Sequence, residues 1–170
     1  MAWTTPRTWT SNEVVTAALL NTHVRDNLNY LLSRSNNQIV RANGSNYTTT
    51  SGTFAAIDTT NLSITLTMTT TKVLLILSGM AYNSTAGSGG EIDFDFFVDG
   101  TRIGASYTRG LYGFYTPTAN YWCAVNLSII TTVTAGSRVF KPVWRTGGGT
   151  GNFISDTGNA PALFAAIEVA

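Results

Sequence analysis

The pattern of apolar residues changes near residue 36, and this change limits the folds open to the chain. Before it, apolar residues recur at three- and four-residue steps, as on one face of a helix. After it, apolar residues alternate with threonine and serine, most regularly over residues 62–69, as in strands with one solvated face. We therefore expect an N-terminal arm over residues 1–10, an amphipathic helix over 11–35 and a β-domain over 36–170.

The helix has two sequence signals for its start. Thr10 and Glu13 have the spacing of a capping box, in which each side chain bonds the backbone N–H of the other residue. Trp9 and Val14 then occupy the two positions of a hydrophobic staple. Both signals predict a helix that begins directly after Thr10. Asn21 falls at an a position of a short heptad pattern, where asparagine fixes the register and number of helices in a bundle.

The apolar face of this helix needs a partner. Two partners remain open: a symmetry mate or foreign surface, or the chain's own sheet. The region ahead of the helix is rich in large aromatic residues, which a free, solvated tail does not need. We therefore expect the arm and helix to form an anchor carried by Trp3, Pro6, Arg7, Trp9, Val14, Leu28 and Leu31.

The sequence after residue 36 predicts a mainly β fold. It contains about eight strands separated by turns rich in glycine, asparagine and threonine, which is typical of a jelly-roll β-sandwich. Residues 73–77 form a continuous apolar run, as in a central strand covered on both faces. Pro142 cannot donate to a ladder, so its strand should lie at an edge or be bulged there. Residues 121–130 are apolar on both faces, and this surplus predicts burial against another subunit.

The composition limits the partners. Charged residues make up 11% of the chain and the formal net charge is +1, so no basic field gathers nucleic acid or anionic lipid. No run reaches the ~18 apolar residues of a membrane span, and the first residues lack the apolar core of a secretory signal. Cys123 is the single cysteine, which excludes an intramolecular disulfide. We expect no nucleic-acid partner, no membrane partner and no cofactor.

No residue pattern predicts an enzyme. His23 and Asp26 lie one helical turn apart, but no serine or cysteine nucleophile has a plausible motif near them. A glycan hydrolase needs a pair of carboxylates in a cleft, and the close carboxylates lie along one predicted strand. We therefore expect a protein that binds rather than catalyses.

Those carboxylates form a candidate metal site. Glu91, Asp93 and Asp95 alternate along one side of the strand, and Asp99 follows at its turn. Together with loop oxygens they could hold a calcium ion. The interpretation that we favour is a solvated strand face whose charge resists edge-to-edge aggregation.

An aromatic segment over residues 111–122 is a candidate ligand site. It gathers five aromatic side chains around a proline turn, and such a cluster can contact carbohydrate or protein. The candidate ligand loop consists of Tyr112, Phe114 and Tyr115. The competing interpretation, which we favour, is the packed end of the barrel or a subunit interface.

The N-terminal sequence resembles a known family. The cassette W-T-S-N-E-V-V-T-A-A-L-L-N-T-H-V-R-D-N-L-N-Y-L, preceded by MAWTTPRT, closely resembles the N-terminal signature of small structural proteins of tailed bacteriophages and prophages. This resemblance covers about the first 35 residues. The remainder is similar in strand order and turn placement to the trimeric jelly rolls of the tumour necrosis factor and complement-head type, including a last strand, ALFAAIEV.

These resemblances imply a homotrimeric virion protein, made in the cytoplasm of the host bacterium, whose function is binding. Its role would be capsid decoration, as a cement or head-fibre protein docked on the major capsid protein or another virion protein. The alternative is a tail-fibre or tail-tip protein that binds host surface glycans. The residues that we expect at the trimer interface are Tyr121, Trp122, Trp144 and Phe164.

Overall fold

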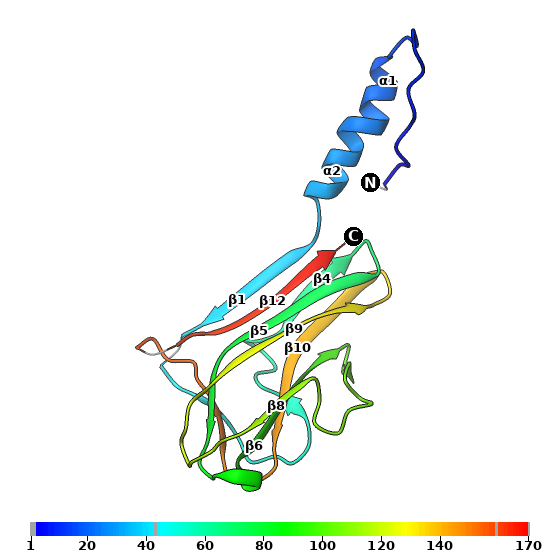
Figure 1. Ribbon diagram of the computed structural model, residues 1–170. Coiled ribbons are helices and arrows are strands. Elements are labelled where there is room, and N and C mark those ends of the chain that lie inside the picture. Colours follow the sequence, from blue (N-terminus) through cyan, green and yellow to red (C-terminus); the bar gives the residue numbers. More distant parts are fainter. Residues whose placement is uncertain (1–2, 43, 159, 170) are drawn as a thin grey trace. The chain divides into compact units, whose positions relative to one another are not determined.

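The structure is a computed structural model that describes residues 3–42, 44–158 and 160–169. It divides into two compact units, Met1–Arg34 and Ser35–Ala170. The first, the helical unit, contains α1, η1 and α2; the second, the β-unit, contains strands β1 to β12 (Figure 1). The division therefore falls between Arg34 and Ser35, close to the change in sequence pattern.

The helical unit contains one continuous helix with a π-helical middle. Its parts are α1 (Ala17–Leu20), η1 (Asn21–Arg25) and α2 (Asp26–Leu32). Thr16 is the N-cap, and its hydroxyl accepts a hydrogen bond from the backbone N–H of Leu19 at 3.3 Å. A cap of this kind satisfies one of the N–H groups that the first helical turn leaves open.

The predicted helix over 11–35 is therefore too long at its start. Asn12 has φ +64°, a left-handed conformation that no helix accommodates. The Glu13 carboxylate does accept from the Thr10 N–H at 3.2 Å, as a capping box requires, but here the pair closes a turn. Val14 is 80% exposed, so it forms no hydrophobic staple.

The arm ahead of the helix folds back along it (Figure 1). Asn27, which is buried in α2, holds the arm through both halves of its amide. Its Oδ1 accepts from the Thr4 N–H and its Nδ2 donates to the Thr4 carbonyl, each at 2.9 Å. Trp3 packs on Tyr30, with ring centroids 6.1 Å apart. The arm and helix thus form one small folded unit.

The β-unit consists of two six-stranded antiparallel sheets. Sheet A contains β1 (Asn36–Arg41), β2 (Tyr47–Thr49), β5 (Lys72–Asn83), β9 (Cys123–Thr132), β11 (Gly151–Phe153) and β12 (Ala162–Val169). Sheet B contains β3 (Ala55–Ala56), β4 (Ile64–Met68), β6 (Glu91–Val98), β7 (Thr101–Arg102), β8 (Tyr112–Tyr115) and β10 (Gly136–Thr146). A short 3-10 helix, η2 (Gly87–Gly90), precedes β6.

The strand order is that of a jelly roll. The long strands run β1-β12-β5-β9 in sheet A and β4-β10-β6-β8 in sheet B. Numbered along the chain as eight strands, this is 1-8-3-6 against 2-7-4-5, the arrangement of two Greek keys wrapped into two sheets. The prediction of a mainly β jelly-roll sandwich is confirmed. The four other strands are short additions at the sheet margins.

Pro142 lies in a central strand. β10 pairs with β6 along residues 140–146, and on its other side with β4 and then with β3. Pro142 falls in the gap between these two neighbours, since the pairing of β10 with β4 stops at Phe140 and its pairing with β3 starts at Val143. The missing proline N–H therefore costs no ladder bond.

The core lies between the sheets and is largely aromatic. Phe94 packs against Trp144, with ring centroids 6.2 Å apart, and Phe96 stacks on Phe164 at 6.0 Å. Trp144 is 2% exposed and Phe164 is fully buried. The prediction that these two residues contact another subunit is therefore wrong, because both point into the sandwich and fill its interior.

Candidate functional site

The outer face of sheet A, turned away from sheet B, is apolar. In β5, Val73, Leu75 and Leu77 are fully buried between the sheets, whereas Leu74 and Ile76 between them stay partly exposed. Alternation of this kind places the second set on the opposite face. The sequence predicted cover on both faces of this strand, and within the described part of the β-unit only one face is covered.

Cross-strand pairs extend this apolar face over neighbouring strands. Leu74 lies between Ile167 of β12 and Ile130 of β9, and Ile130 is 59% exposed. At the other end of the face, Trp122 stacks on Tyr82 with ring centroids 6.0 Å apart. We call this surface the sheet A face; it comprises Val40, Leu74, Ile76, Met80, Tyr82, Trp122, Ile130, Leu163 and Ile167.

The sheet A face has the character of a contact surface. Contiguous exposed apolar area of this kind marks interaction sites in proteins that are otherwise well packed. Of the four residues predicted at a trimer interface, Trp122 belongs to this face and is 40% exposed. Tyr121 beside it is also exposed. These two remain candidates, whereas Trp144 and Phe164 do not.

A second apolar surface lies on the helical unit. Leu20, Val24, Leu28 and Leu31 follow one another at three- and four-residue steps, and all are about half-exposed. We call this row the helix stripe. It borders a hollow of about 210 Å³, lined by Trp3, Pro6, His23, Val24, Asn27, Leu28 and Leu31. Four of the seven predicted anchor residues thus meet around one hollow.

The three other predicted anchor residues lie elsewhere on the helical unit. Arg7 forms an ion pair with Glu13, and its guanidinium lies 5.3 Å from the centre of the Trp9 ring. Trp9 contacts His23 edge to face. Val14 is exposed in the segment before the helix.

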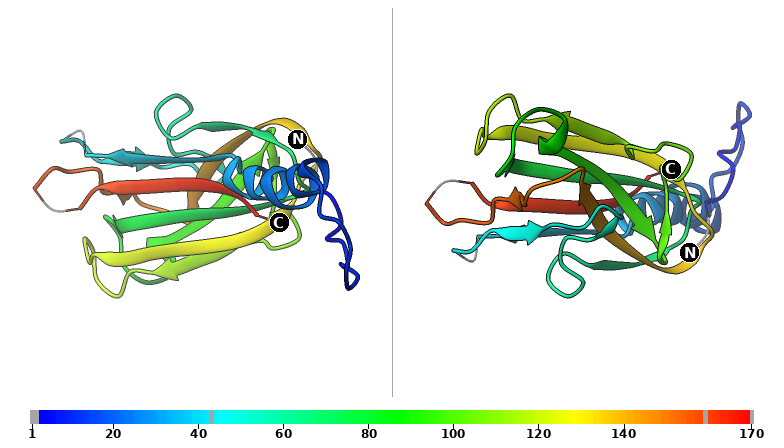
Figure 2. Two further views of the ribbon diagram at one scale, coloured as in Figure 1. Left: turned by 90° about the horizontal axis from the view of Figure 1, so that it is seen from above. Right: turned by 90° about the horizontal axis from the view of Figure 1, so that it is seen from below.

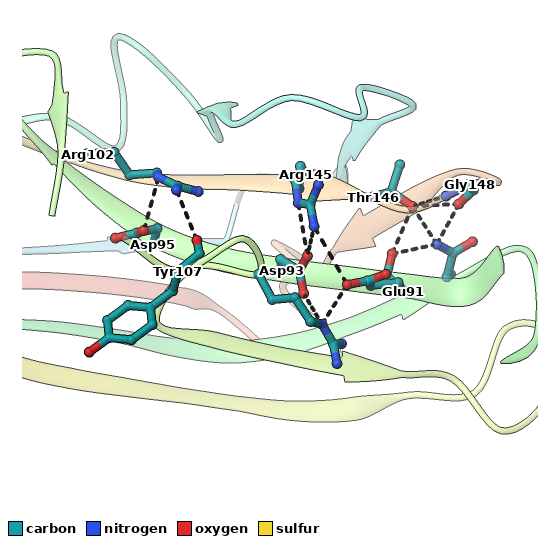
Figure 3. A network of polar contacts seen from close by, with 10 residues as sticks. Glu91, Asp93, Asp95, Arg102, Tyr107, Arg145, Thr146 and Gly148 are labelled. Atoms are coloured by element: carbon teal, nitrogen blue, oxygen red, sulfur yellow. Dashed lines mark hydrogen bonds and ion pairs between the residues drawn. The ribbon is translucent and has the colours of Figure 1, made fainter. Parts of the chain in front are cut away.

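The four carboxylates of the predicted calcium site are each paired with arginine, and Figure 3 shows Glu91, Asp93 and Asp95 among them. Asp93 is fully buried and accepts from Arg145 at 2.8 and 2.9 Å and from Arg109 at 3.3 Å. Glu91 pairs with Arg109 at 2.6 Å. Burial and the adjacent Glu91 raise the pKa of Asp93 to about 6, an effect that Arg145 opposes only in part.

Asp95 and Asp99 also form ion pairs with arginine, and both accept backbone hydrogen bonds. Asp95 is fully buried, accepts from the backbone N–H groups of Phe96 and Gly104, and pairs with Arg102 at 3.5 Å. Burial raises its pKa. Asp99 pairs with Arg138 at 2.8 Å and accepts from a backbone N–H.

The calcium prediction is therefore wrong, because these oxygens already bind cationic side chains and backbone donors. The favoured alternative, a solvated strand face, is also wrong for Asp93 and Asp95, since both are buried. Among the described residues, no group of three or more histidine, cysteine or carboxylate side chains is placed to hold a metal ion. The network instead fixes the segment between β7 and β8 onto β6.

The aromatic segment is mostly structural. Tyr112 and Phe114 lie on β8, pack on Phe94 and belong to the margin of the core. The Tyr112 hydroxyl also donates to the carbonyl of Ala124 at 3.0 Å. Tyr115 is exposed, with the Arg109 guanidinium 4.3 Å from its ring centre. One of the three rings predicted to contact a ligand is thus free to do so.

Asn27 and Glu168 are important residues that the sequence did not single out. Asn27 holds the arm, and Glu168 accepts four hydrogen bonds at the end of β12. An asparagine on the apolar side of a helix is a usable signal, because burial of an amide requires partners. The same holds for a lone glutamate in the strand ALFAAIEV.

Comparison by sequence finds no matching family model and no matching characterised protein. Among solved structures, dimeric latent PorU from Porphyromonas gingivalis is similar over 79% of this chain and 13% of its own, with 9% identity and a TM-score of 0.38. The VP2 subviral particle of infectious bursal disease virus is similar over 81% and 38%, with 11% identity and a TM-score of 0.37. The structure of the Gt strain of that virus is similar over 81% of this chain and 37% of its own, with 13% identity and a TM-score of 0.29. Scores of this size do not establish a common fold.

In the part of the chain that the structure describes, no helix has the length and hydropathy needed to span a membrane.

Proposed function

We propose that this chain is a structural protein of a tailed-bacteriophage virion, a homotrimer that decorates the capsid. Its helical unit attaches to the major capsid protein or another virion protein, and its jelly roll forms the trimer. Its function is binding, without catalysis or a cofactor. The N-terminal cassette, which resembles the signature of phage structural proteins, supports the virion assignment.

One observation carries the proposal: the chain has two compact units, and each leaves an apolar surface exposed. Contiguous exposed apolar surfaces are uncommon on proteins that work as monomers. A trimer that binds a particle uses both, because the sheet A face is buried between copies and the helix stripe is buried on the particle. The two surfaces thus correspond to two interfaces.

The glycan-binding alternative has less support. It requires exposed aromatic rings that stack on sugars, and Tyr112 and Phe114 pack against the core instead. Of the three residues of the predicted ligand loop, Tyr115 alone is exposed. A capsid protein needs no such site, so this arrangement favours decoration over host recognition.

Particle attachment is tested by removing residues 1–34. The buried core cluster of the β-unit draws only on residues 57–166, so the β-unit should fold alone. We expect the truncated protein to stay trimeric and to be missing from purified virions. Normal incorporation of the truncated protein would contradict the role of the helical unit.

Point substitutions test the same role without deletion. Leu28→Glu combined with Leu31→Glu places two charges in the helix stripe, and we expect incorporation into virions to fall at least tenfold, since each buried charge costs more than 1.4 kcal/mol. Asn29→Glu is the control, because Asn29 is an exposed polar residue of the same helix. Equal loss in the control would show that added charge alone is responsible.

A further inference from the structure

A hollow of about 420 Å³ lies on the outer face of sheet B. Its floor lies on β6 and β10, in the sheet across the sandwich from β5 and β12 (Figure 2). Phe97 and Val139 line this floor, whereas their chain neighbours Phe96 and Phe140 point into the core. Ala56 completes the apolar part of the lining. The volume falls within the range of small-molecule sites, and the hollow belongs to neither the sheet A face nor the helix stripe.

Both walls of the hollow are bonded to β10. On one side, the Ile57 N–H donates to the Pro142 carbonyl at 3.0 Å. On the other, the Asp99 N–H donates to the Val139 carbonyl at 2.9 Å, and the Val139 N–H donates back to the Asp99 carboxylate at 2.8 Å. Lys141 lies on β10 between these two points and lines the hollow. The hollow is therefore preformed, with a lysine between its walls.

Lys141 gives the hollow one uncompensated positive charge. Among the described residues, no carboxylate forms an ion pair with its ammonium group. Asp99 at the rim is already neutralised, since its carboxylate pairs with Arg138 at 2.8 Å and accepts the Val139 N–H. An anion beside Lys141 is attracted more strongly than in bulk water, because the lysine is partly buried. The matching ligand therefore carries one negative charge on an apolar body.

The acidic side chains of a second copy are poor candidates for this ligand. Each of the nine acidic residues already forms an ion pair or accepts a hydrogen bond within the chain. They are Glu13, Asp26, Asp58, Glu91, Asp93, Asp95, Asp99, Asp156 and Glu168. Aspartate and glutamate side chains are also short, so either would leave most of the apolar floor uncovered. A separate small molecule fits the hollow better.

We propose that this hollow binds a small carboxylic acid with an apolar body of aryl-alkanoate size. The body lies on Phe97, Val139 and Ala56, and the carboxylate pairs with the Lys141 ammonium. Thr59 at the rim offers a hydroxyl as a second donor. A carboxylate suits the site better than a phosphate, because a lysine is a single compact charge and a phosphate needs several donors. The site is independent of the proposed trimer and of particle attachment.

Titration followed by two-dimensional NMR tests the site with matched probes. The probe is phenylpropionate. One control is phenylpropanamide, which keeps the body without the charge, and the other is acetate, which keeps the charge without the body. Because a probe of this size has few atoms, we expect a dissociation constant in the millimolar range. Both controls should bind about tenfold more weakly or worse. The amide signals that shift should be those of residues 56–59, 97–100 and 139–141.

Lys141→Met gives the second arm of the test, because methionine keeps an apolar stem and removes the charge. We expect it to weaken phenylpropionate binding about tenfold or more and to leave the affinity for the amide unchanged. Lys72→Met is the matched control, since Lys72 is the one other lysine of the sequence and begins β5 in sheet A. It should bind phenylpropionate as the unchanged protein does. Unaltered amide signals away from the hollow would show that both variants fold.

Three results would overturn the proposal. Equal binding of phenylpropionate and its amide would show that Lys141 selects no anion. Equal binding of phenylpropionate by the two lysine variants, or shifts spread outside the three ranges, would mark an adventitious additive only. Shifts in the same ranges that grow with protein concentration, without any probe, would show that a second copy occupies the hollow.

Discussion

Glu168 joins the first residue of the β-unit to the end of its last strand. Its carboxylate accepts from the backbone N–H groups of Ser35, Thr69 and Thr70 and from the Thr69 hydroxyl, at 2.5 to 3.0 Å. Burial opposes ionisation, but the hydrogen bonds from Thr69, Ser35 and Thr70 outweigh it and lower the pKa of Glu168 to about 2. The carboxylate is therefore a stabilising group only while it is ionised.

Glu168→Gln should lower the free energy of unfolding at pH 7 by about 1–3 kcal/mol, because an amide replaces a charged acceptor. The folded pKa lies below the ordinary value of 4.5, so this stabilisation is present above pH 4.5 and is lost as the pH falls towards 2. Urea denaturation of both proteins across this range measures the difference. A difference that stays constant from pH 7 to pH 3 would contradict this account of Glu168.

Two tryptophans that the sequence analysis assigned to the same interface should respond to substitution in opposite ways. Trp144→Ala empties the core and should cost about 3–5 kcal/mol of stability. Trp122→Ala removes a ring from the sheet A face, so it should change the stability of a monomer little and weaken association. Denaturation and sedimentation of both variants measure the two effects. A Trp122 variant as unstable as the Trp144 variant would place Trp122 in the core instead.

At the scale of elements, the arm and helix depend on one side chain. Asn27 forms two hydrogen bonds with the Thr4 backbone and a third with the His23 carbonyl at 3.2 Å. The aromatic contact between Trp3 and Tyr30 is tilted and half-exposed, so it alone holds the arm weakly. The amide is therefore the main link between arm and helix.

Asn27→Ala should release the arm. We expect residues 3–9 to lose hydrogen-exchange protection and to become sensitive to protease, with a local cost of about 1–2 kcal/mol. The melting of the β-unit should not change. Asn29→Ala, an exposed substitution on the same helix, is the control. An arm that stays protected in the Asn27 variant would show that the aromatic contacts suffice.

Alternation along the chain was sufficient to predict the jelly roll, because each strand with one apolar side needs one covering layer. It could not assign Phe164, since β12 is largely apolar on both sides. In β10 the pattern did carry a signal, because Trp144 shares its side with Phe140, opposite Lys141. The predictions for the carboxylates were wrong for another reason. Asp93 meets Arg109 and Arg145, which are 16 and 52 residues away in the chain. The predicted start of the helix was wrong because the spacing of apolar residues does not show that Asn12 adopts a left-handed conformation.

At the scale of the whole molecule, the proposal assigns each of the two exposed apolar surfaces to an interface, so it predicts that the monomer is not the working form. The central residues of the sheet A face lie on β5, the longest described strand of the β-unit, and its neighbours β9 and β12 extend the face. Burial of this face between copies would supply the second cover that the apolar run of residues 73–77 predicts. Trimer formation is therefore the central claim of the proposal.

Ile76→Lys should dissociate the trimer and leave a folded monomer. The substitution places a charge at the middle of the sheet A face, where burial between copies would be costly. Thr65→Lys is the matched control, because Thr65 is an exposed residue of β4 in the other sheet. Light scattering of both variants measures association, and an Ile76 variant that associates normally would exclude this face.

Sedimentation equilibrium of the full chain at micromolar concentration tests the central claim most directly. The monomer mass is 18.2 kDa. The account predicts a single species of three times that mass, unchanged on dilution within the micromolar range. A mass of 18.2 kDa under the same conditions would contradict it.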